Sequence, residues 1–362
     1  MRYMRSYWLV MLPLLLAALP GCEREPMAAG EADAMRTIRF NARPELSSAV
    51  TRAGEDVPDA SDYLFTNGNQ IGVFATWVSD EHVSTDVFSK IPVTYDDGDW
   101  LYSPLKYWRR GGKYHFRAVF PFGVNTQYGT DGTRLVASYS MFADNYDLMV
   151  AGYERDMAGD DTSPVPLVFK HACAAVRVVF RKGSEDENRH YLLNSCQMKY
   201  LRSMGVLVYD QDDVTLDSWQ SAEFRSPSVL AWSAGSESHY IDVPASYTDF
   251  KQVNAHGWNQ WHFVIPQNLN EDDGNHPALE FSMHVRQYHD DGVTLSYQTD
   301  EPVYTTLRLP ETYTENDQTK DFCWEPGKTY TYYVQIQAGQ ASINVKVVDW
   351  DAYYVYVDDL IF

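Results

Sequence analysis

Short runs of strand-forming residues recur along nearly the whole chain, and they limit the fold more than any other feature. The runs are residues 37–42, 71–75, 91–95, 114–120, 135–139, 165–169, 174–180, 205–209, 261–265, 279–285, 293–297 and 303–309. Many alternate apolar and polar residues, as half-buried strands do because successive side chains point to opposite faces. Tyr and Trp, with 26 and 10 copies, also favour strands. The pattern predicts an all-β protein.

Turn signals separate these runs. Examples are Asp96-Asp97-Gly98-Asp99 and Arg110-Gly111-Gly112-Lys113, in which glycine allows a positive φ. Near the end of the chain, residues 330–336 and 343–347 are predicted to form a hairpin. Strands at this spacing indicate a β-sandwich rather than a parallel α/β sheet.

The chain opens with a short apolar leader that stops at a cysteine. Arg2 and Arg5 supply a positive start, residues 8–19 are almost wholly apolar, and Gly21 precedes Cys22. This layout predicts a signal peptide over residues 1–21, because the apolar run is too short to span a bilayer comfortably. The position of Cys22 resembles the lipobox of bacterial lipoproteins, in which the cysteine is acylated. We therefore expect an exported outer-membrane lipoprotein at the cell surface, with plain secretion as the alternative.

The length beyond the leader favours two domains. About 340 residues remain, which is more than one compact core usually holds. Residues 22–35 read as a flexible tether, 36–165 as an N-terminal domain, 166–350 as a C-terminal domain and 351–362 as a tail.

The net charge of the chain limits the classes of partner that it can bind. The chain has 29 basic and 50 acidic residues, a net charge of −21. Such a chain repels nucleic acid and anionic lipid surfaces. We expect no nucleic-acid partner, and membrane contact only through the lipid on Cys22.

The sequence predicts no enzyme, cofactor or metal site. It lacks the nucleophile-elbow, metalloprotease, phosphate-loop and EF-hand motifs, and its ten histidines are dispersed. Cys173, Cys196 and Cys323 are too widely spaced for a zinc site. Cys173 reads as a small buried hydrophobe, and one pair of the three cysteines could form a disulfide.

Several segments together resemble the fimbrillin family, the pilins of type V pili in Bacteroidota. In chain order they are residues 147–151, 165–178, 263–269, 324–332 and 343–350. Each segment is a weak signal, but their order and spacing extend over nearly the whole mature chain. The resemblance implies two transthyretin-like Greek-key β-sandwich domains in tandem. It also implies export as a lipoprotein, cleavage by an Arg-specific protease, and assembly with other pilin subunits through strand addition.

The resemblance assigns roles near the N-terminus. The strand removed by cleavage corresponds to residues 37–42, with Ile38, Phe40 and Ala42 on one face. The family pattern suggests a cut after Arg52, in Thr51-Arg52-Ala53, with Arg43 as a second choice. A polar loop between strands is where a protease reaches the backbone, although an ordinary surface loop looks the same.

The tail is the candidate donor strand. It is rich in strand-forming residues at five consecutive positions, Tyr353, Tyr354, Val355, Tyr356 and Val357. Tyr354 and Tyr356 form one alternate set, and the other three residues form the second. The alternative is an edge strand that pairs within its own domain, since a free apolar strand without a partner promotes aggregation.

The sequence thus predicts a structural or accessory pilin subunit of cell-surface fimbriae that supports adhesion. A tip adhesin, or a carbohydrate-binding outer-membrane lipoprotein, is the alternative, with a host or bacterial surface ligand as its partner. Trp258 and Trp261 flank a polar pair, an arrangement that suits stacking on a sugar.

Overall fold

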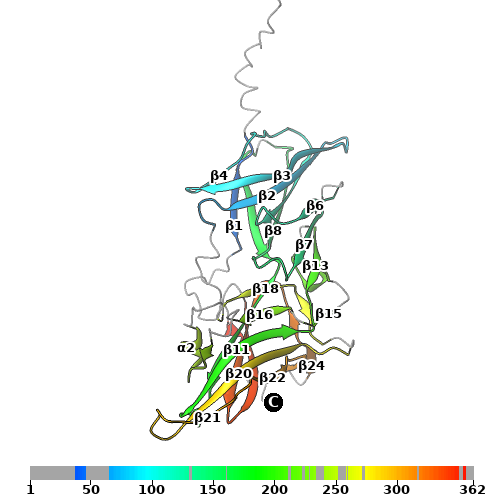
Figure 1. Ribbon diagram of the computed structural model, residues 1–362. Coiled ribbons are helices and arrows are strands. Elements are labelled where there is room, and N and C mark those ends of the chain that lie inside the picture. Colours follow the sequence, from blue (N-terminus) through cyan, green and yellow to red (C-terminus); the bar gives the residue numbers. More distant parts are fainter. Residues whose placement is uncertain are drawn as a thin grey trace, which may run out of the picture.

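The protein is built almost entirely of β-strands in an elongated molecule with an upper and a lower part (Figure 1). The structure is a computed structural model, and it describes residues 37–45, 65–129, 133–159, 161–210, 213–221, 225–227, 229–233, 240–251, 258, 260–270, 274–315, 318–349 and 354–355. The predicted all-β sandwich class is confirmed.

A seven-stranded sheet forms the upper part, with the strand order β1-β9-β8-β5-β2-β3-β4. Its strands are β1 (Phe40–Pro44), β2 (Gln70–Val78), β3 (Ser84–Asp96), β4 (Asp99–Leu101), β5 (Lys113–Phe120), β8 (Met149–Asp156) and β9 (Val165–His171). Phe116 on β5 lies at the centre of the apolar core beneath this sheet, stacked on Tyr114 and edge-on to Trp108.

The turn between β3 and β4 has the geometry that its residues favour. Asp96 pairs with Asp99, leaving Asp97 and Gly98 as the two turn residues, both with positive φ. A two-residue turn of this kind matches the twist of the strands, and Asp-Gly is among its preferred sequences. The turn predicted at this point is confirmed.

A four-stranded sheet joins strands from the two halves of the sequence. It contains β6 (Thr126–Tyr128), β7 (Leu135–Ser140), β13 (Met204–Tyr209) and β14 (Trp219–Ser221), in the order β14-β13-β7-β6. The apolar core of the lower part extends into this region, because Leu135 and Ala137 belong to the same cluster as residues near 340. The division into domains at residue 165 stays a prediction.

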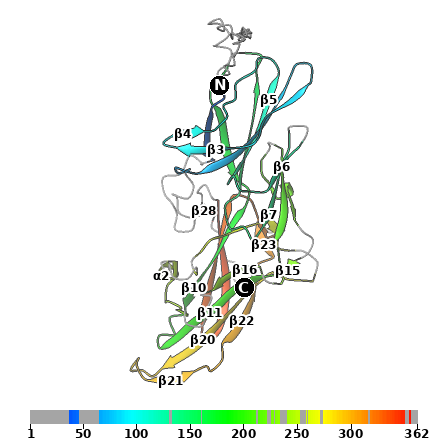
Figure 2. The same ribbon diagram turned by 45° about the horizontal axis from the view of Figure 1, so that its top comes forward.

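Two larger sheets form the lower part (Figure 2). One contains β10 (Ala174–Lys182), β18 (His262–Val264), β26 (Lys328–Gln337), β27 (Gln340–Asp349) and β28 (Tyr354–Val355). The other contains β11 (Arg189–Lys199), β16 (Leu230–Ser233), β17 (Ile241–Asp242), β20 (Ala278–Tyr288), β21 (Leu295–Gln298) and β22 (Val303–Arg308). Phe180 of the first sheet meets Phe281 of the second edge-on, with ring centroids 5.3 Å apart. The hairpin predicted over residues 330–347 is confirmed as β26 and β27.

Short elements complete the described chain. They are β12 (Leu201–Arg202), β15 (Arg225–Ser226), β19 (Gln267–Asn268), β23 (Thr312–Glu315), β24 (Gln318–Asp321), β25 (Cys323–Trp324), the 3-10 helix η2 (Leu216–Ser218) and the helix α2 (Tyr247–Lys251). Phe250 of α2 packs against Phe180, which covers one end of the lower core.

His262 gives this core a pH dependence that can be tested. Its ring lies edge-on to Trp232 at 4.6 Å, and burial lowers its pKa from 6.5 to about 4. Between these two pH values His262 is protonated in the unfolded chain but not in the folded chain. The free energy of unfolding is therefore highest above about pH 6.5 and falls as the pH drops towards 4.

We expect His262→Gln to lessen the acid-induced loss of unfolding free energy between pH 7 and 4 by up to about 3 kcal/mol. Urea unfolding at several pH values measures this loss. The matched control is His289→Gln, which removes a histidine at an exposed position. Equal pH slopes for wild type and His262→Gln would contradict the expectation.

Candidate functional site

The first strand, β1, lies at one end of the seven-stranded sheet and pairs with β9 in parallel. Phe40, Ala42 and Pro44 stand beside Val165, Leu167 and Phe169 in register. Every one of these six side chains is buried, while Asn41 and Arg43, between them, are exposed. β1 therefore covers an apolar row of β9 and also pairs with the backbone edge of β9.

Phe40 is the main apolar contact of β1. Its ring meets Phe88, Tyr102 and Phe116 edge-on, with centroid distances of 5.4, 5.7 and 6.2 Å. Such aromatic contacts add about 0.5–1.5 kcal/mol to the free energy of area burial. Phe40 thus connects β1 to the centre of the upper core.

Side chains near β4, at the other end of the sheet, hold the free edge of β1. The indole Nε1 of Trp100 donates to the carbonyl oxygen of Ala42 at 3.1 Å, and the Tyr102 hydroxyl donates to the carbonyl oxygen of Ile38 at 2.7 Å. The Ile38 amide donates to the carbonyl oxygen of Lys106 at 2.9 Å. β1, one terminal strand of the sheet, thus also contacts β4 and the residues after it at the other end, and these contacts bring the two ends together.

The boundaries of the first strand differ from the predicted ones. Ile38, Phe40 and Ala42 do share a buried face, but the strand begins at Phe40 and continues to Pro44. Residues 37–38 turn instead towards the chain after β4, where Thr37 forms an isolated bridge with Tyr107. The strand can continue to Pro44 because an edge strand tolerates proline, which has no amide to donate.

The two arginines suggested for cleavage have different positions. Arg43 lies inside β1, where its backbone pairs with Val168 and its side chain is exposed. Arg43 therefore lies within a strand rather than in a loop. Arg52 and Cys22 lie outside the described residues, and the roles suggested for all three stay predictions.

The described part of the tail lies on the lower sheet. Tyr354 and Val355 form β28, which pairs antiparallel with Val348 and Val347 of β27. This pairing is the one expected of an edge strand within the same chain. Tyr353, Tyr356 and Val357 lie outside the described residues, and the donor role stays a prediction.

The aromatic platform proposed for sugar binding is not formed. Trp258 is buried, with 1 % of its surface exposed, so it cannot present a face to a ligand. Trp261 is half-buried, and the Arg177 guanidinium lies over its ring, 4.4 Å from the centroid. The prediction of a platform flanked by both tryptophans is wrong because Trp258 is buried, and spacing alone does not distinguish core tryptophans from surface ones.

The cysteines belong to the framework. None of the three described cysteines is disulfide-bonded, and Cys173 and Cys196 are fully buried. Burial raises the pKa of both thiols, which keeps them protonated near neutral pH. Cys173 is thus confirmed as a small buried residue, and the described cysteines form no disulfide.

Within the part of the chain that the structure describes, no group of three or more His, Cys, Asp or Glu side chains is placed to hold a metal ion. No helix there is both long and apolar enough to cross a membrane.

Sequence reasoning missed the residues that hold the free edge of β1. Trp100 and Tyr102 follow the Asp97-Gly98 turn, and the turn gave the only local signal near them. Nothing in their spacing indicates a contact with residues about 60 positions earlier in the chain.

Comparisons with known proteins agree with this architecture. The model of a family described as fimbrillin-like matches residues 51–350. Its match begins after β1 and ends before the tail. No curated protein sequence matches the chain.

Solved structures share the fold at low identity. A fimbrial protein from Bacteroides vulgatus is 12 % identical, with a TM-score of 0.51, over 87 % of this chain and 99 % of that chain. A candidate cell adhesion protein from Bacteroides uniformis is 14 % identical, with a TM-score of 0.50, over 87 % and 99 % of the two chains. At this identity the similarity concerns the fold alone.

The contribution of β1 to stability can be measured at two adjacent residues. We expect Phe40→Ala to lower the free energy of unfolding by about 3 kcal/mol, because it removes a buried ring and leaves a cavity. Asn41→Ala, at the exposed neighbour, should change it by less than about 0.5 kcal/mol. Chemical denaturation provides both values, and similar losses for the two variants would show that β1 does not contribute to the core through its buried face.

Proposed function

Since the chain belongs to the fimbrillin-like family, we propose that it is a structural or accessory pilin subunit of cell-surface fimbriae. In this proposal, a strand of a neighbouring subunit replaces β1 and links the two subunits. Family membership supports a role in pili or adhesion at the cell surface, rather than in catalysis.

One observation carries the proposal: β1 is an edge strand with a fully buried face. Its ladder covers five residues, from Phe40↔Val165 to Pro44↔Phe169. A short segment near the chain terminus thus occupies a site inside the core. Such a segment can be exchanged for another of the same pattern without rebuilding the rest of the sheet.

Removal of β1 would leave an open site at which binding of another strand is strongly favourable. The row formed by Val165, Leu167 and Phe169 would lose its cover, as would the rings around Phe40. Exposing a buried Phe or Leu side chain costs about 1.5–3 kcal/mol. A buried backbone group left without a partner adds about 1–3 kcal/mol. The open site is therefore a strong acceptor for an extended apolar segment.

The tail has the pattern that this site requires. A replacement strand needs about five extended residues with apolar side chains at alternate positions. Residues 353–357 offer two such sets, Tyr354 with Tyr356, or Tyr353 with Val355 and Val357. No proline or glycine interrupts the segment.

Cleavage would couple export to assembly. A cut after Arg52 by an Arg-specific protease separates β1 and the predicted lipid on Cys22 from the rest of the chain. The lipid would then deliver the subunit to the outer membrane, and its loss would release the subunit into the fibre. Arg43 is a less favourable site, because its backbone belongs to the β1–β9 ladder.

A tip subunit is the second candidate, favoured by the position of the tail. Tyr354 and Val355 pair with β27 of their own chain. A subunit whose tail stays on its own sheet would accept a strand but donate none, and it would end the fibre.

The donor role is tested by tail variants. We expect Cys22→Ser protein digested with an Arg-specific protease to form fibres visible by electron microscopy. The same protein ending at Trp350 should form none, because it lacks the donor segment. Of Tyr356→Asp and Val357→Asp, the one whose side chain faces the groove should block assembly. Asp359→Asn serves as the matched control.

Two results would contradict parts of the proposal. Fibres from the chain ending at Trp350 would exclude the tail as donor. Absence of fibres from the digested full-length chain, with β1 released, would favour the tip subunit. Arg52→Gln should keep β1 attached, whereas Arg43→Gln should not.

A further inference from the structure

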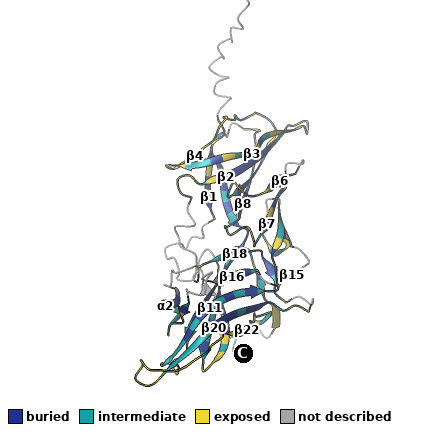
Figure 3. Cartoon of the chain, in the orientation of Figure 1, coloured by how far each residue is buried: buried dark blue, intermediate teal, exposed yellow. Residues whose placement is uncertain are grey.

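The lower end of the molecule carries a β-arm that nothing in the described chain covers. β20 is long, and its outer edge pairs first with β22 and then, beyond Val285, with β21. All residues from 289 to 298 are exposed, so both faces of β21 are open (Figure 3). We name residues 288–304 the distal arm.

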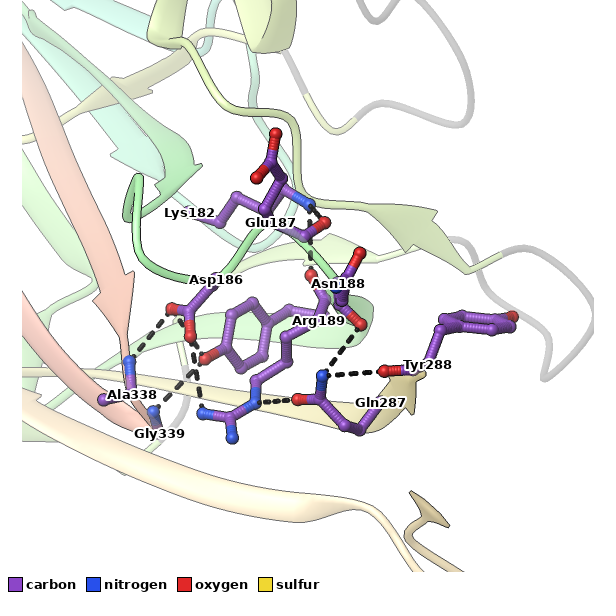
Figure 4. A network of polar contacts seen from close by, with 10 residues as sticks. Lys182, Asp186, Glu187, Asn188, Arg189, Gln287, Tyr288, Ala338 and Gly339 are labelled. Carbon is purple, nitrogen blue, oxygen red and sulfur yellow. Dashed lines mark hydrogen bonds and ion pairs between the residues drawn. The ribbon is translucent and has the colours of Figure 1, made fainter. Parts of the chain in front are cut away.

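A polar network fixes the root of the distal arm (Figure 4). The buried Asp186 carboxylate accepts hydrogen bonds from the Tyr191 hydroxyl at 3.0 Å and the Ala338 amide at 2.9 Å. Arg189 contacts the same carboxylate at 3.4 Å and donates through Nε to Gln287 on β20 at 2.9 Å. The arm therefore extends from an anchored base rather than from a loose loop.

The surface of the distal arm combines apolar and acidic side chains. Its exposed apolar residues are Val293, Leu295, Tyr297, Val303 and Tyr304, with Val293 80 % and Tyr304 68 % exposed. These are five of the eleven exposed large hydrophobic side chains found among the described residues. The exposed acids beside them are Asp290, Asp291, Asp300 and Glu301. An edge strand with exposed apolar residues promotes association unless a partner covers it.

The charges of the arm define the partner's chemistry. Two identical arms would bring acids against acids, so pairing between arms is disfavoured. A surface that complements the arm would carry exposed apolar side chains beside Lys or Arg side chains.

The chain itself has such a surface at its other end, in the segment between β4 and β5. Leu105 and Tyr107 are 53 % and 47 % exposed, and Lys106, Arg109 and Arg110 lie among and beside them. We name residues 105–112 the proximal loop. β4 and β5 lie in the upper part and β21 at the lower end, so the two surfaces are at opposite ends of the molecule (Figures 1 and 2).

The proximal loop is held in place by contacts to β2 and the turn after it. The indole Nε1 of Trp77 donates to the Gly111 carbonyl oxygen at 2.8 Å, and the Arg109 guanidinium lies 5.3 Å from the centroid of the same ring. The Gly112 amide donates to Asp80 at 3.0 Å. Gly112 also lies so close to the backbone of β2 that an added Cβ would meet the Val78 oxygen at 2.1 Å. A surface fixed in this way loses little conformational entropy on binding.

We propose that the distal arm of one copy docks on the proximal loop of the next. The contact joins unlike surfaces at opposite ends, so it repeats along a line rather than closing into a dimer. It rests on the proposed fibre function, to which it adds a second, reversible contact that aligns subunits before strands are exchanged.

Charge exchange between the two surfaces tests the contact in uncleaved Cys22→Ser protein, in which β1 still fills its site. We expect salt-sensitive, concentration-dependent association in sedimentation velocity, stronger at about 20 mM than at about 500 mM salt. Asp290→Lys/Glu301→Lys on the arm, or Arg109→Glu/Arg110→Glu on the loop, should each weaken association at least about tenfold. An equal mixture of the two variants should restore it, because every arm then meets a loop of opposite charge.

The matched control for the arm variant is Asp217→Lys/Asp249→Lys, which makes the same change in net charge as the arm variant, at exposed acids outside both surfaces. It should leave the association intact. A monomer at low salt, or a mixture that fails to associate, would overturn the inference. Absence of fibres after Arg-specific digestion, with end-to-end association intact, would instead count against the proposed function alone.

Discussion

A strand inside a sheet needs hydrogen-bond partners for its backbone and a cover for its apolar side chains, and at the end of the upper sheet β1 provides both for β9. Five residues pair with β9 in register, and Trp100 and Tyr102 bind the opposite edge. Phe40 connects this strand to the rings of Phe88 and Phe116. The closure of the sheet and the shape of the upper core depend on this one strand.

The same constraint explains how such a chain can serve as a fibre subunit. In the proposed assembly, a site that is costly to leave empty would accept a strand with the right alternation, and the tail of a neighbour would supply that strand. Strand exchange provides strength, whereas exposed charges provide orientation and speed of encounter. The distal arm and the proximal loop belong to the second kind of contact, since both are exposed and of opposite charge.

Local signals in the sequence predicted the parts of the fold that local interactions decide. Turn chemistry and the alternation of apolar and polar residues predict the Asp97-Gly98 turn, the hairpin over residues 330–347 and the all-β class. Non-local features did not follow. The parallel pairing of β1 with β9 joins segments about 125 residues apart, and the end of β1 at Pro44 depends on that pairing. The polar neighbours of Trp258 predict a surface position, yet its side chain is buried.

Hydrogen exchange on β9 tests the central claim most directly, because backbone protection reports whether a strand stands at its edge. With β1 in place, the amides of residues 165–169 should exchange slowly. After Arg-specific cleavage and release of β1 they should exchange faster, and in assembled fibres their protection should return. Protection that is unchanged by the release of β1, or that stays lost in fibres, would contradict the account.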